Sequence, residues 1–397
     1  MTAWLDVIGI GETGWAGLSP TAQARLRAAQ IIIGGRRHHA LAPDLAARRI
    51  LWPQPFRAMT EEVRALRGTP TAVLVTGDPL WYSAGARFCT LFAPVEITFH
   101  PQLSAFQLAA ARMGWSLADL DTLTVHGRPT EQAIPFFAHG ARLLILTQDA
   151  GCPARIAQLL CAAGYGSSRL TVLGALGGAE ESRIDGIAAS WDAVAPAFHV
   201  LAVSCEAAPG ARPLPRTGLP DDAFAHDGKM TKREMRALTL SALAPTRGAR
   251  LWDIGTGCGS VAIEWMRAAR DMAAVGIEPD AARRAMAASN AARLGAPRLS
   301  LIEGRAPEAL ADLPAPDAVF IGGGLSEAVI DAAIAALPRL GRLVANAVTL
   351  ESEARLIAAQ ARHGGTLTRL SVARAEPIGG MRGWRPMMPV TQWVWVK

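Results

Sequence analysis

The chain has 397 residues, which is too long for one ordinary hydrophobic core and predicts two or three domains. Half of the residues are hydrophobic and 19% are charged, a composition that excludes a disordered chain. The formal net charge is +6, carried almost entirely by arginine, because Lys229, Lys232 and Lys397 are the only lysines. No basic run with interleaved aromatic residues indicates a nucleic-acid partner, so the arginines reflect either coding bias or a polyanionic small molecule.

Cysteine usage and the chain start predict a soluble cytoplasmic protein without a bound metal. The N-terminus lacks the basic, apolar and small-residue order of a signal peptide, and no apolar run reaches membrane-spanning length. No pair of cysteines has the spacing of a zinc or redox motif, since the five are scattered at Cys89, Cys152, Cys161, Cys205 and Cys258.

Short apolar runs alternate with helix-periodic stretches, which predicts α/β layers with mostly parallel sheets. The clearest break is the Pro- and Gly-rich segment Cys205–Pro220. We therefore expect a domain over 1–205, a linker over 206–220 and a second domain over 221–397. In the first domain the expected strands are 5–10, 31–33, 72–76, 95–99, 123–125, 143–147, 170–176 and 200–204, with helices at 22–29 and 105–113.

The second domain has a cleaner alternation, which predicts a doubly wound sheet closed by two further extended runs. The expected strands are 250–254, 274–278, 299–303, 318–321, 342–345, 366–373 and 390–396, and the expected helices are 261–269, 281–294, 327–337 and 351–362.

The strongest motif is Asp253-Ile-Gly-Thr-Gly-Cys-Gly-Ser260, which follows an apolar strand and leads into a helix. Its glycines allow a tight turn and a close approach of a ligand to the backbone. Ser260 stands where the dinucleotide fingerprint requires glycine or alanine, so the spacing instead resembles motif one of the seven-stranded methyltransferases. The residues expected to bind the methyl donor here are Asp253, Gly255, Thr256, Gly257 and Gly259.

The next two strands end in groups that suit the rest of a methyl donor. Gly276-Ile-Glu278 places a carboxylate at a strand tip, the position that takes ribose hydroxyls in dinucleotide folds. Glu303-Gly-Arg-Ala306 ends the third strand, where the adenine would lie. We expect Glu278, Gly304, Arg305 and Ala306 to contact the methyl donor. The alternatives to a methyl-donor site are a site for another nucleotide and a plain turn without a ligand.

The segment His226–Glu234 is unusually rich in functional groups. Thr231, with Glu234 three residues later, predicts a capping box at a helix start. The same entry could present Lys232 or Arg233 to an anionic substrate. The candidates for a proton donor are His226, Asp227, Lys232 and Glu234.

The stretch Leu219–Leu238, the Asp253 motif and Phe320-Ile-Gly322-Gly-Gly together resemble the C-terminal half of the precorrin-6Y C-5,15-methyltransferases (decarboxylating). The resemblance adds Thr231 and Gly322 to the expected contacts with the donor, S-adenosylmethionine. It implies methylation of C-15 of a precorrin and loss of carbon dioxide from the ring C acetate.

In the first half, Val7-Ile-Gly-Ile-Gly-Glu-Thr-Gly14 follows a strand as a dinucleotide fingerprint would. The next strand ends in Gly34–His39, which has no acidic residue for a ribose, although its arginines leave an NADP site open. The adjacent His38 and His39 suggest a metal, but neighbours on an extended chain point in opposite directions.

Gly77-Asp-Pro-Leu80 alone predicts a capped turn. With the Gly9 loop, Pro101–Arg112 and His126–Pro129, it resembles the tetrapyrrole methylases, although Ser104-Ala105 replaces their usual serine pair. The resemblance implies two α/β lobes with the donor folded between them, and methylation of C-5. It places Gly77, Asp78, Pro79, Leu80 and Ser104 at the donor, and the loop with Gly9, Gly11 and Gly14 beside the tetrapyrrole. Because such a substrate carries many carboxylates, Arg128 and, from the second half, Arg233 are further candidates to bind it.

The two resemblances cover nearly the whole chain and imply a bifunctional corrin-biosynthesis enzyme that forms homo-oligomers and has no nucleic-acid or membrane partner. Sulfonium methyl transfer depends mainly on alignment and a dry pocket. Two alternatives remain. An RNA or protein methyltransferase with an N-terminal specificity domain predicts a continuous basic surface, and a precorrin carrier with one inactive half predicts a single donor site.

Overall fold

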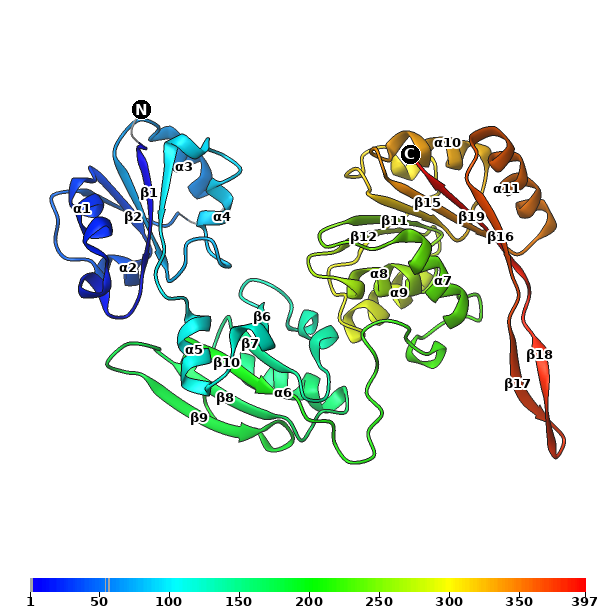
Figure 1. The fold of residues 1–397 in the computed structure, drawn as a ribbon, viewed down its shortest axis with the longest axis horizontal. Helices are drawn as coiled ribbons and strands as arrows, with labels where there is room; N and C mark the ends of the chain where they lie inside the picture. The colour runs from blue at the N-terminus through cyan, green and yellow to red at the C-terminus, as the bar shows by residue number, and fades with distance from the viewer. Residues whose placement is uncertain (1–2, 54, 56–57) are drawn as a thin grey trace. The chain divides into compact units, whose positions relative to one another are not determined.

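The computed structural model describes residues 3–53, 55 and 58–397. The chain forms two compact units, which are described here one at a time (Figure 1). The units divide between Ala211 and Arg212, within the proline-rich segment, and the domain limits expected from the sequence stay predictions. Unit 1 comprises Met1–Thr130 and Phe137–Ala211, and unit 2 comprises Glu131–Phe136 and Arg212–Lys397.

The first sheet of unit 1 has five parallel strands in the order β3-β2-β4-β1-β5. Every residue of β1 is buried, and Val7 packs into one apolar cluster while Ile8 packs into another. Both faces of this sheet are therefore covered, as is usual for parallel strands. Its elements are β1 (Leu5–Ile10), α1 (Pro20–Ala28), β2 (Ile31–Gly34), α2 (Arg36–Leu41), β3 (Arg48–Leu51), α3 (Met59–Ala65), β4 (Thr71–Thr76), α4 (Gly85–Phe88) and β5 (Ile97–His100).

The second sheet of unit 1 has the order β6-β7-β10-β8-β9 and departs from the expectation of mostly parallel strands. Only β6 and β7 pair in parallel, because β8, β9 and β10 follow one another through connections without a crossover helix. Phe106 of α5 packs against this sheet. The elements are α5 (Ala105–Met113), β6 (Asp121–Thr124), β7 (Arg142–Leu146), α6 (Cys152–Ala162), β8 (Arg169–Gly174), β9 (Ser182–Ile187) and β10 (His199–Ser204).

Unit 2 contains a seven-stranded sheet in the order β13-β12-β11-β14-β15-β19-β16, which confirms the predicted doubly wound architecture. All neighbours are parallel except β19, which runs antiparallel to both β15 and β16. The elements are α7 (Arg233–Leu243), β11 (Arg250–Ile254), α8 (Ser260–Ala268), β12 (Ala273–Ile277), α9 (Ala281–Arg293), β13 (Ser300–Ile302), β14 (Ala318–Ile321), α10 (Glu327–Ala336), β15 (Arg342–Ala347), α11 (Leu350–His363), β16 (Thr366–Leu370) and β19 (Val390–Val396).

A two-stranded hairpin lies between β16 and β19, where the sequence predicted only one extended run to residue 373. It consists of β17 (Ala373–Ile378) and β18 (Met381–Pro386), which turn at Gly379 with φ +58°. Figure 1 shows it as an arm that projects from the seven-stranded sheet of its own unit. Its apolar side chains are exposed, with Trp384 at 76% and Met381 at 79%.

Candidate functional site

The turn after β11 requires its glycines. Gly255 has φ +74°, and a Cβ there would lie 2.8 Å from the backbone of Gly323, so the turns after β11 and β14 are in direct contact. Gly257 has φ +55° with no atom within 4 Å of a Cβ position, and Gly259, the N-cap of α8, has φ +82°. These conformations are accessible to glycine at little cost, and they leave open space above Gly257 for a ligand.

The carboxyl group of Asp253 is buried beneath this turn with one oxygen unused. Its Oδ2 accepts hydrogen bonds from the Thr256 hydroxyl (2.7 Å) and the Ala262 N–H (3.1 Å). Oδ1 has no partner among the residues that the structure describes, and burial raises the pKa of Asp253 to about 6. A buried acceptor without a donor is costly, so this oxygen is available to a hydrogen-bonding ligand.

Glu278 lies directly after β12 and is tied to the glycine turn. Its Oε2 accepts a hydrogen bond from the Gly257 N–H (3.1 Å), and its Oε1 accepts one from the Asp280 N–H (3.1 Å). Each oxygen keeps a second lone pair, so the carboxylate can still accept hydrogen bonds from ribose hydroxyls. The structure thus brings Glu278, the residue expected to bind the ribose, to the glycine turn that is expected to bind the donor.

The residues expected at the adenine follow β13, whose end is joined to the end of β12 through Arg284. Arg284 donates to the Glu278 carbonyl (2.8 Å) and forms an ion pair with Glu303 (2.6 Å), which joins the ends of β12 and β13. Gly304 has φ +147°, a conformation in which an L side chain is strained. Arg305 and Ala306 follow it directly, and the Gly322 N–H donates to the carbonyl of Ile254 (3.0 Å) in β11.

The capping box expected from Thr231 and Glu234 is wrong. Lys232 is the N-cap of α7, and its side chain makes no capping hydrogen bond. The Arg233 N–H instead donates to Oδ1 of Asp221 (2.9 Å), a residue distant in sequence. The Glu234 carboxylate is paired with an arginine of the hairpin, which satisfies it better than a local backbone N–H.

That arginine is Arg374, which donates one hydrogen bond to Glu234 (2.5 Å) and another to Asp221 (2.9 Å). The hydrogen bond from Arg374 lowers the pKa of Glu234. Glu234 is therefore held ionised, which makes it a poor proton donor.

Of the three other candidate proton donors, His226 and Lys232 have no ionic partner among the described residues, whereas Asp227 does. Asp227 is paired with Arg283 at the start of α9 (2.8 Å). The His226 ring is exposed, and its Nδ1 accepts the N–H of the residue two positions later (3.0 Å). In residues 3–53, 55 and 58–397, no hydrogen-bond or ionic partner is found for the Lys232 ammonium group. The geometry favours His226 and Lys232 over the two acidic candidates.

A buried ion pair that sequence reasoning missed holds this segment in place. Arg236 and Glu264 are 0% and 1% exposed, and Nε of Arg236 lies 2.6 Å from Oε1 of Glu264. Arg236 also donates to the Thr231 carbonyl (2.7 Å), while Glu264 accepts the N–H of Leu219 (3.0 Å). Because α8 begins at the glycine turn, the pair fixes the Met-Thr-Lys stretch relative to that turn. The available signal was a charged residue on an otherwise apolar helix face.

Asn290 of α9, which the sequence did not reveal as a site residue either, also holds this segment in place. It is fully buried, its Oδ1 accepts the Ala225 N–H (2.9 Å), and its Nδ2 donates to the carbonyls of Ala225 (2.8 Å) and Cys258 (3.0 Å). Cys258 belongs to the glycine motif, so the chain just before His226 is joined directly to that motif.

In unit 1, three predicted loops meet through their backbones. A Cβ on Gly9 would lie 1.8 Å from the Gly77 carbonyl oxygen, and a Cβ on Gly77, where φ is +63°, would lie 2.9 Å from Cα of Ser104. Ser104 is the N-cap of α5, and its Oγ accepts the Gln107 N–H (3.3 Å). The expected donor residues Gly77 and Ser104 are therefore packed against the expected substrate loop at Gly9.

The remaining expected residues of unit 1 surround these loops. The Asp78 carboxylate accepts the Leu80 N–H (2.7 Å), which confirms a capped turn, and Pro79 is buried. The Arg128 guanidinium lies 6.0 Å from the ring of Tyr82, and Arg128 is exposed. Gly14 has φ +57° and requires glycine, whereas Gly11 has free space around its Cβ position.

The two adjacent histidines lie in α2, not on the extended chain that the sequence suggested. His38 Nε2 lies 2.9 Å from the Thr76 hydroxyl, whereas His39 Nε2 lies 3.0 Å from the Ile50 carbonyl oxygen. Across the described residues, no group of three or more His, Cys, Asp or Glu side chains is placed to hold a metal ion. No helix in the same residues is long and apolar enough to cross a membrane.

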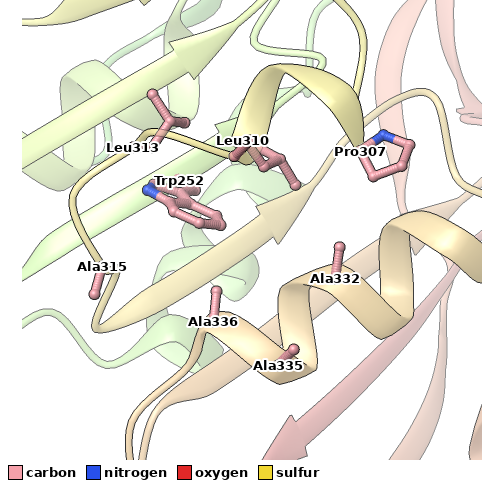
Figure 2. Close-up of a pocket in the computed structure, with 9 residues that line it drawn as sticks. Trp252, Pro307, Leu310, Leu313, Ala315, Ala332, Ala335 and Ala336 are labelled. Atoms are coloured by element: carbon pink, nitrogen blue, oxygen red, sulfur yellow. The ribbon is translucent and has the colours of Figure 1, made fainter.

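Figure 2 shows an apolar hollow in unit 2 between Trp252, the Pro307–Leu313 segment and α10. The Trp252 indole N–H donates to the Pro314 carbonyl (3.0 Å) and is satisfied. The hollow contains none of the residues expected to bind the donor or substrate, and no titratable side chain lines it. It is an apolar surface hollow whose lining offers no group for catalysis.

Comparison with known proteins assigns a family to each part of the chain. Residues 5–189 match the tetrapyrrole (corrin/porphyrin) methylases, and residues 222–397 match the precorrin methyltransferase domain. Both resemblances inferred from the motifs are thereby confirmed, as is the two-module α/β fold.

Individual relatives match either the whole chain or a part of it. A Sinorhizobium protein named precorrin-6Y C(5,15)-methyltransferase [decarboxylating] is 50% identical over 100% of this chain and 97% of its own length. A Pyrobaculum calidifontis protein, named a probable cobalt-precorrin-6B C(15)-methyltransferase (decarboxylating), is 37% identical over 42% of this chain and 89% of its own. A Salmonella typhimurium cobalt-precorrin-7 C(5)-methyltransferase is 32% identical over 45% of this chain and 88% of its own. The chain belongs to the precorrin-6Y C(5,15)-methyltransferase (decarboxylating) family.

Proposed function

We propose that the protein converts precorrin-6Y to precorrin-8 in cobalamin biosynthesis, by methylating C-5 and C-15 and removing the ring C acetate carboxyl group as carbon dioxide. The observation that carries the proposal is the 50% identity, over the full chain, to a relative of that name. The presence of two unrelated candidate donor sites in one chain supports it, because the reaction needs two methyl transfers.

The methyl donor that fits both sites is S-adenosylmethionine, which supplies an electrophilic methyl group from its sulfonium when bound. In unit 2, Glu278 can accept the ribose hydroxyls, and the unpaired Oδ1 of Asp253 and the open turn at Gly257 can receive polar groups nearby. In unit 1, the turn at Gly77 and the N-terminus of α5 at Ser104 form a second backbone-lined cradle. Both sites bring backbone close to the ligand, as alignment for in-line displacement requires.

We assign methylation of C-5 to unit 1 and methylation of C-15, with decarboxylation, to unit 2. The names of the two shorter relatives each give one methylation, at C(15) and at C(5), and each relative matches less than half of this chain. Their names give a cobalt-precorrin-6B for the C(15) step and a cobalt-precorrin-7 for the C(5) step, so we expect methylation at C-15 to precede methylation at C-5 in this chain. Substrate and donor are both small intracellular molecules, and we expect the enzyme to work in the cytoplasm.

Decarboxylation requires an electron sink, and the conjugated macrocycle can provide one. The bond between the acetate methylene and its carboxyl carbon breaks, the electron pair enters the ring system, and a proton returns to the methylene carbon. Lys232 and His226 are the candidates to deliver that proton, since Asp227 and Glu234 are paired with arginines. The buried Arg236–Glu264 pair and Asn290 position this segment beside the donor turn.

We also propose that the enzyme is a homo-oligomer and that the β17–β18 arm contributes to the contact. Ile378, Met381 and Trp384 on the arm, and Met388 just after it, are 65 to 79% exposed. Clustered exposed apolar groups of this kind mark surfaces that associate. An RNA substrate is disfavoured, because the chain offers no cluster of lysines.

The experiment that tests the proposal uses the full chain, precorrin-6Y and a donor with a ¹³C-labelled methyl group. NMR of the product is expected to show two labelled methyl resonances, one at C-5 and one at C-15. Calorimetry is expected to give two donor sites per chain. A single labelled resonance with a single donor site would support the carrier alternative, and methylation of RNA in place of the tetrapyrrole would overturn the proposal.

A further inference from the structure

The hydroxyl group of Thr76 accepts two hydrogen bonds at once. Nη1 of Arg37 donates to Oγ1 of Thr76 at 3.2 Å, and Nε2 of His38 lies 2.9 Å from the same oxygen. Arg37 and His38 are adjacent in α2, whereas Thr76 is the last residue of β4. The Gly-Gly-Arg-Arg-His-His segment, which the sequence singled out without a role, is therefore aimed at one hydroxyl group.

The direction of the histidine hydrogen bond follows from its other nitrogen. The Gly35 N–H donates to Nδ1 of His38 at 3.1 Å, so Nδ1 carries no hydrogen. The ring must then be protonated at Nε2, which donates to Thr76. Burial, with Arg37 and His39 nearby, lowers the pKa of His38 to about 4, so the ring remains neutral and keeps this tautomer near pH 7.

These two donors occupy both lone pairs of Thr76 Oγ1, so its own hydrogen must point elsewhere. Within the described part of the chain no acceptor for this hydrogen is found. The five preceding residues of β4 are buried, but Thr76 is exposed at the strand tip. The hydroxyl is thus fixed as a donor towards the space outside β4, and two donors behind it strengthen that donation.

The location of Thr76 connects it to both ligands of unit 1. Gly77, the first residue of the expected donor turn, follows it immediately. The Arg37 guanidinium also pairs with Glu12, in the Gly9–Gly14 loop expected beside the tetrapyrrole, and lies 4.1 Å from the Phe198 ring. Thr76, Glu12 and Phe198 thus contact the Arg37 guanidinium from three sides. Because Glu12 already pairs with Arg37, the group that remains for a ligand is the Thr76 hydroxyl.

We propose that Thr76, oriented by Arg37 and His38, is a carboxylate-binding residue of unit 1. A hydroxyl that is fixed as a donor needs an acceptor, and a carboxylate forms stronger hydrogen bonds than a neutral acceptor does. Two ligands of the proposed reaction carry carboxylates: the acidic side chains of the precorrin and the methionine end of S-adenosylmethionine. The inference rests on the proposed function and names a ligand contact within it.

The test compares Thr76→Val, which removes the hydroxyl at nearly constant volume, with Thr76→Ser, which retains it. Loss of a hydrogen bond to a carboxylate should weaken binding about 10- to 100-fold. Two quantities are measured on the full chain: the KM for the precorrin in ¹³C-methyl transfer to C-5, and the Kd of each S-adenosylmethionine site. Thr90→Val is the matched control, because the Thr90 hydroxyl is exposed and donates to the Arg87 carbonyl (2.8 Å).

A raised KM for the precorrin with unchanged donor binding identifies the substrate as the source of the carboxylate. A raised Kd at one of the two donor sites identifies the methionine end instead. In either case Thr76→Ser should have the wild-type KM and Kd, and C-15 methylation should stay unchanged. Arg37→Met should raise the same constant as Thr76→Val does. Arg37→Met also serves if Thr76→Val does not fold.

The proposal is overturned if Thr76→Val leaves KM and both donor Kd values unchanged, or if Thr76→Ser is as defective as Thr76→Val. A wild-type chain that transfers no methyl group to precorrin-6Y would instead contradict the proposed function. The two failures are therefore distinguishable in one set of measurements.

Discussion

The Gly257 N–H donates a hydrogen bond to the Glu278 carboxylate at 3.1 Å, so the turn after β11 and the tip of β12 are one structural unit before any ligand binds. Glu278 is only 4% exposed, and both of its oxygens are already engaged with backbone N–H groups. A carboxylate held in this way needs no reorganisation to receive ribose hydroxyls. Preorganisation of this kind lowers the entropic cost of binding.

Replacing Glu278 with alanine should therefore weaken donor binding at one of the two sites about 10- to 100-fold, the effect of losing hydrogen bonds to a charged group. Calorimetry on the full chain measures both sites together. Asp271→Ala is the control, because this carboxylate lies just before β12 and forms only an exposed pair with Arg247. Equal affinities in Glu278→Ala and wild type would remove Glu278 from the donor site.

The buried carboxyl group of Asp253 predicts a pH effect of definite sign. Burial raises the pKa of Asp253 from its ordinary value of 3.8 to about 6, so the folded chain binds more protons than the unfolded chain between these values. The contribution of Asp253 to stability is thus present at low pH and is lost as the pH rises towards about 6. Hydrogen exchange of the β11 and β12 amides should show wild type losing stability relative to Asp253→Asn across that interval. A difference that is constant with pH would show that Asp253 does not titrate there.

Breaking the Arg236–Glu264 pair should be strongly destabilising. Arg236→Met leaves the Glu264 charge buried without its partner, which typically costs about 3–5 kcal/mol. Chemical denaturation followed by tryptophan fluorescence measures the loss. Arg247→Met, which breaks the exposed pair with Asp271, should cost under about 1 kcal/mol. Similar losses in the two variants would show that the buried pair does not hold the segment in place.

Gly9→Ala should abolish C-5 methylation and leave C-15 methylation intact. The added methyl group would lie 1.8 Å from the Gly77 carbonyl oxygen, so the two loops must separate. Product NMR with labelled donor reports the two positions independently. Gly166→Ala in the same unit is the control, because its nearest neighbour would lie at an ordinary 3.5 Å. Wild-type activity at C-5 in Gly9→Ala would exclude close packing of these loops as a requirement.

Trp384→Glu should shift the enzyme towards smaller assemblies in analytical ultracentrifugation, since it places a charge on the exposed arm. Leu350→Glu is the matched control, because Leu350 is 81% exposed on α11, outside the arm. A wild-type chain that sediments as a monomer, or a Trp384→Glu variant with an unchanged assembly, would contradict a role for the arm in association.

Local sequence signals predicted the strands and turns well. β1, β11 and β14 have the predicted limits, because each is a mostly apolar run that is followed directly by glycine. The missed strands β3 and β9 are mostly exposed, so they carry no apolar pattern. The arm was missed for the same reason, since its apolar residues do not face a core in this chain.

The site was only partly predictable, because many of its contacts join residues far apart in sequence. Asp253, Glu278 and the glycines follow from motif and strand position. The capping box failed because Asp221 and Arg374, 12 and 140 residues away from their partners, satisfy the helix start and Glu234 better. The links made by Arg236, Asn290 and Thr76 depend on tertiary packing, which no local pattern encodes.

The proposed function is tested most directly by the mass of the product after the full chain is incubated with precorrin-6Y and excess S-adenosylmethionine. This function requires a gain of two methyl groups and the loss of one carbon dioxide. An unchanged mass, from protein whose two donor sites are shown to be filled, would contradict it.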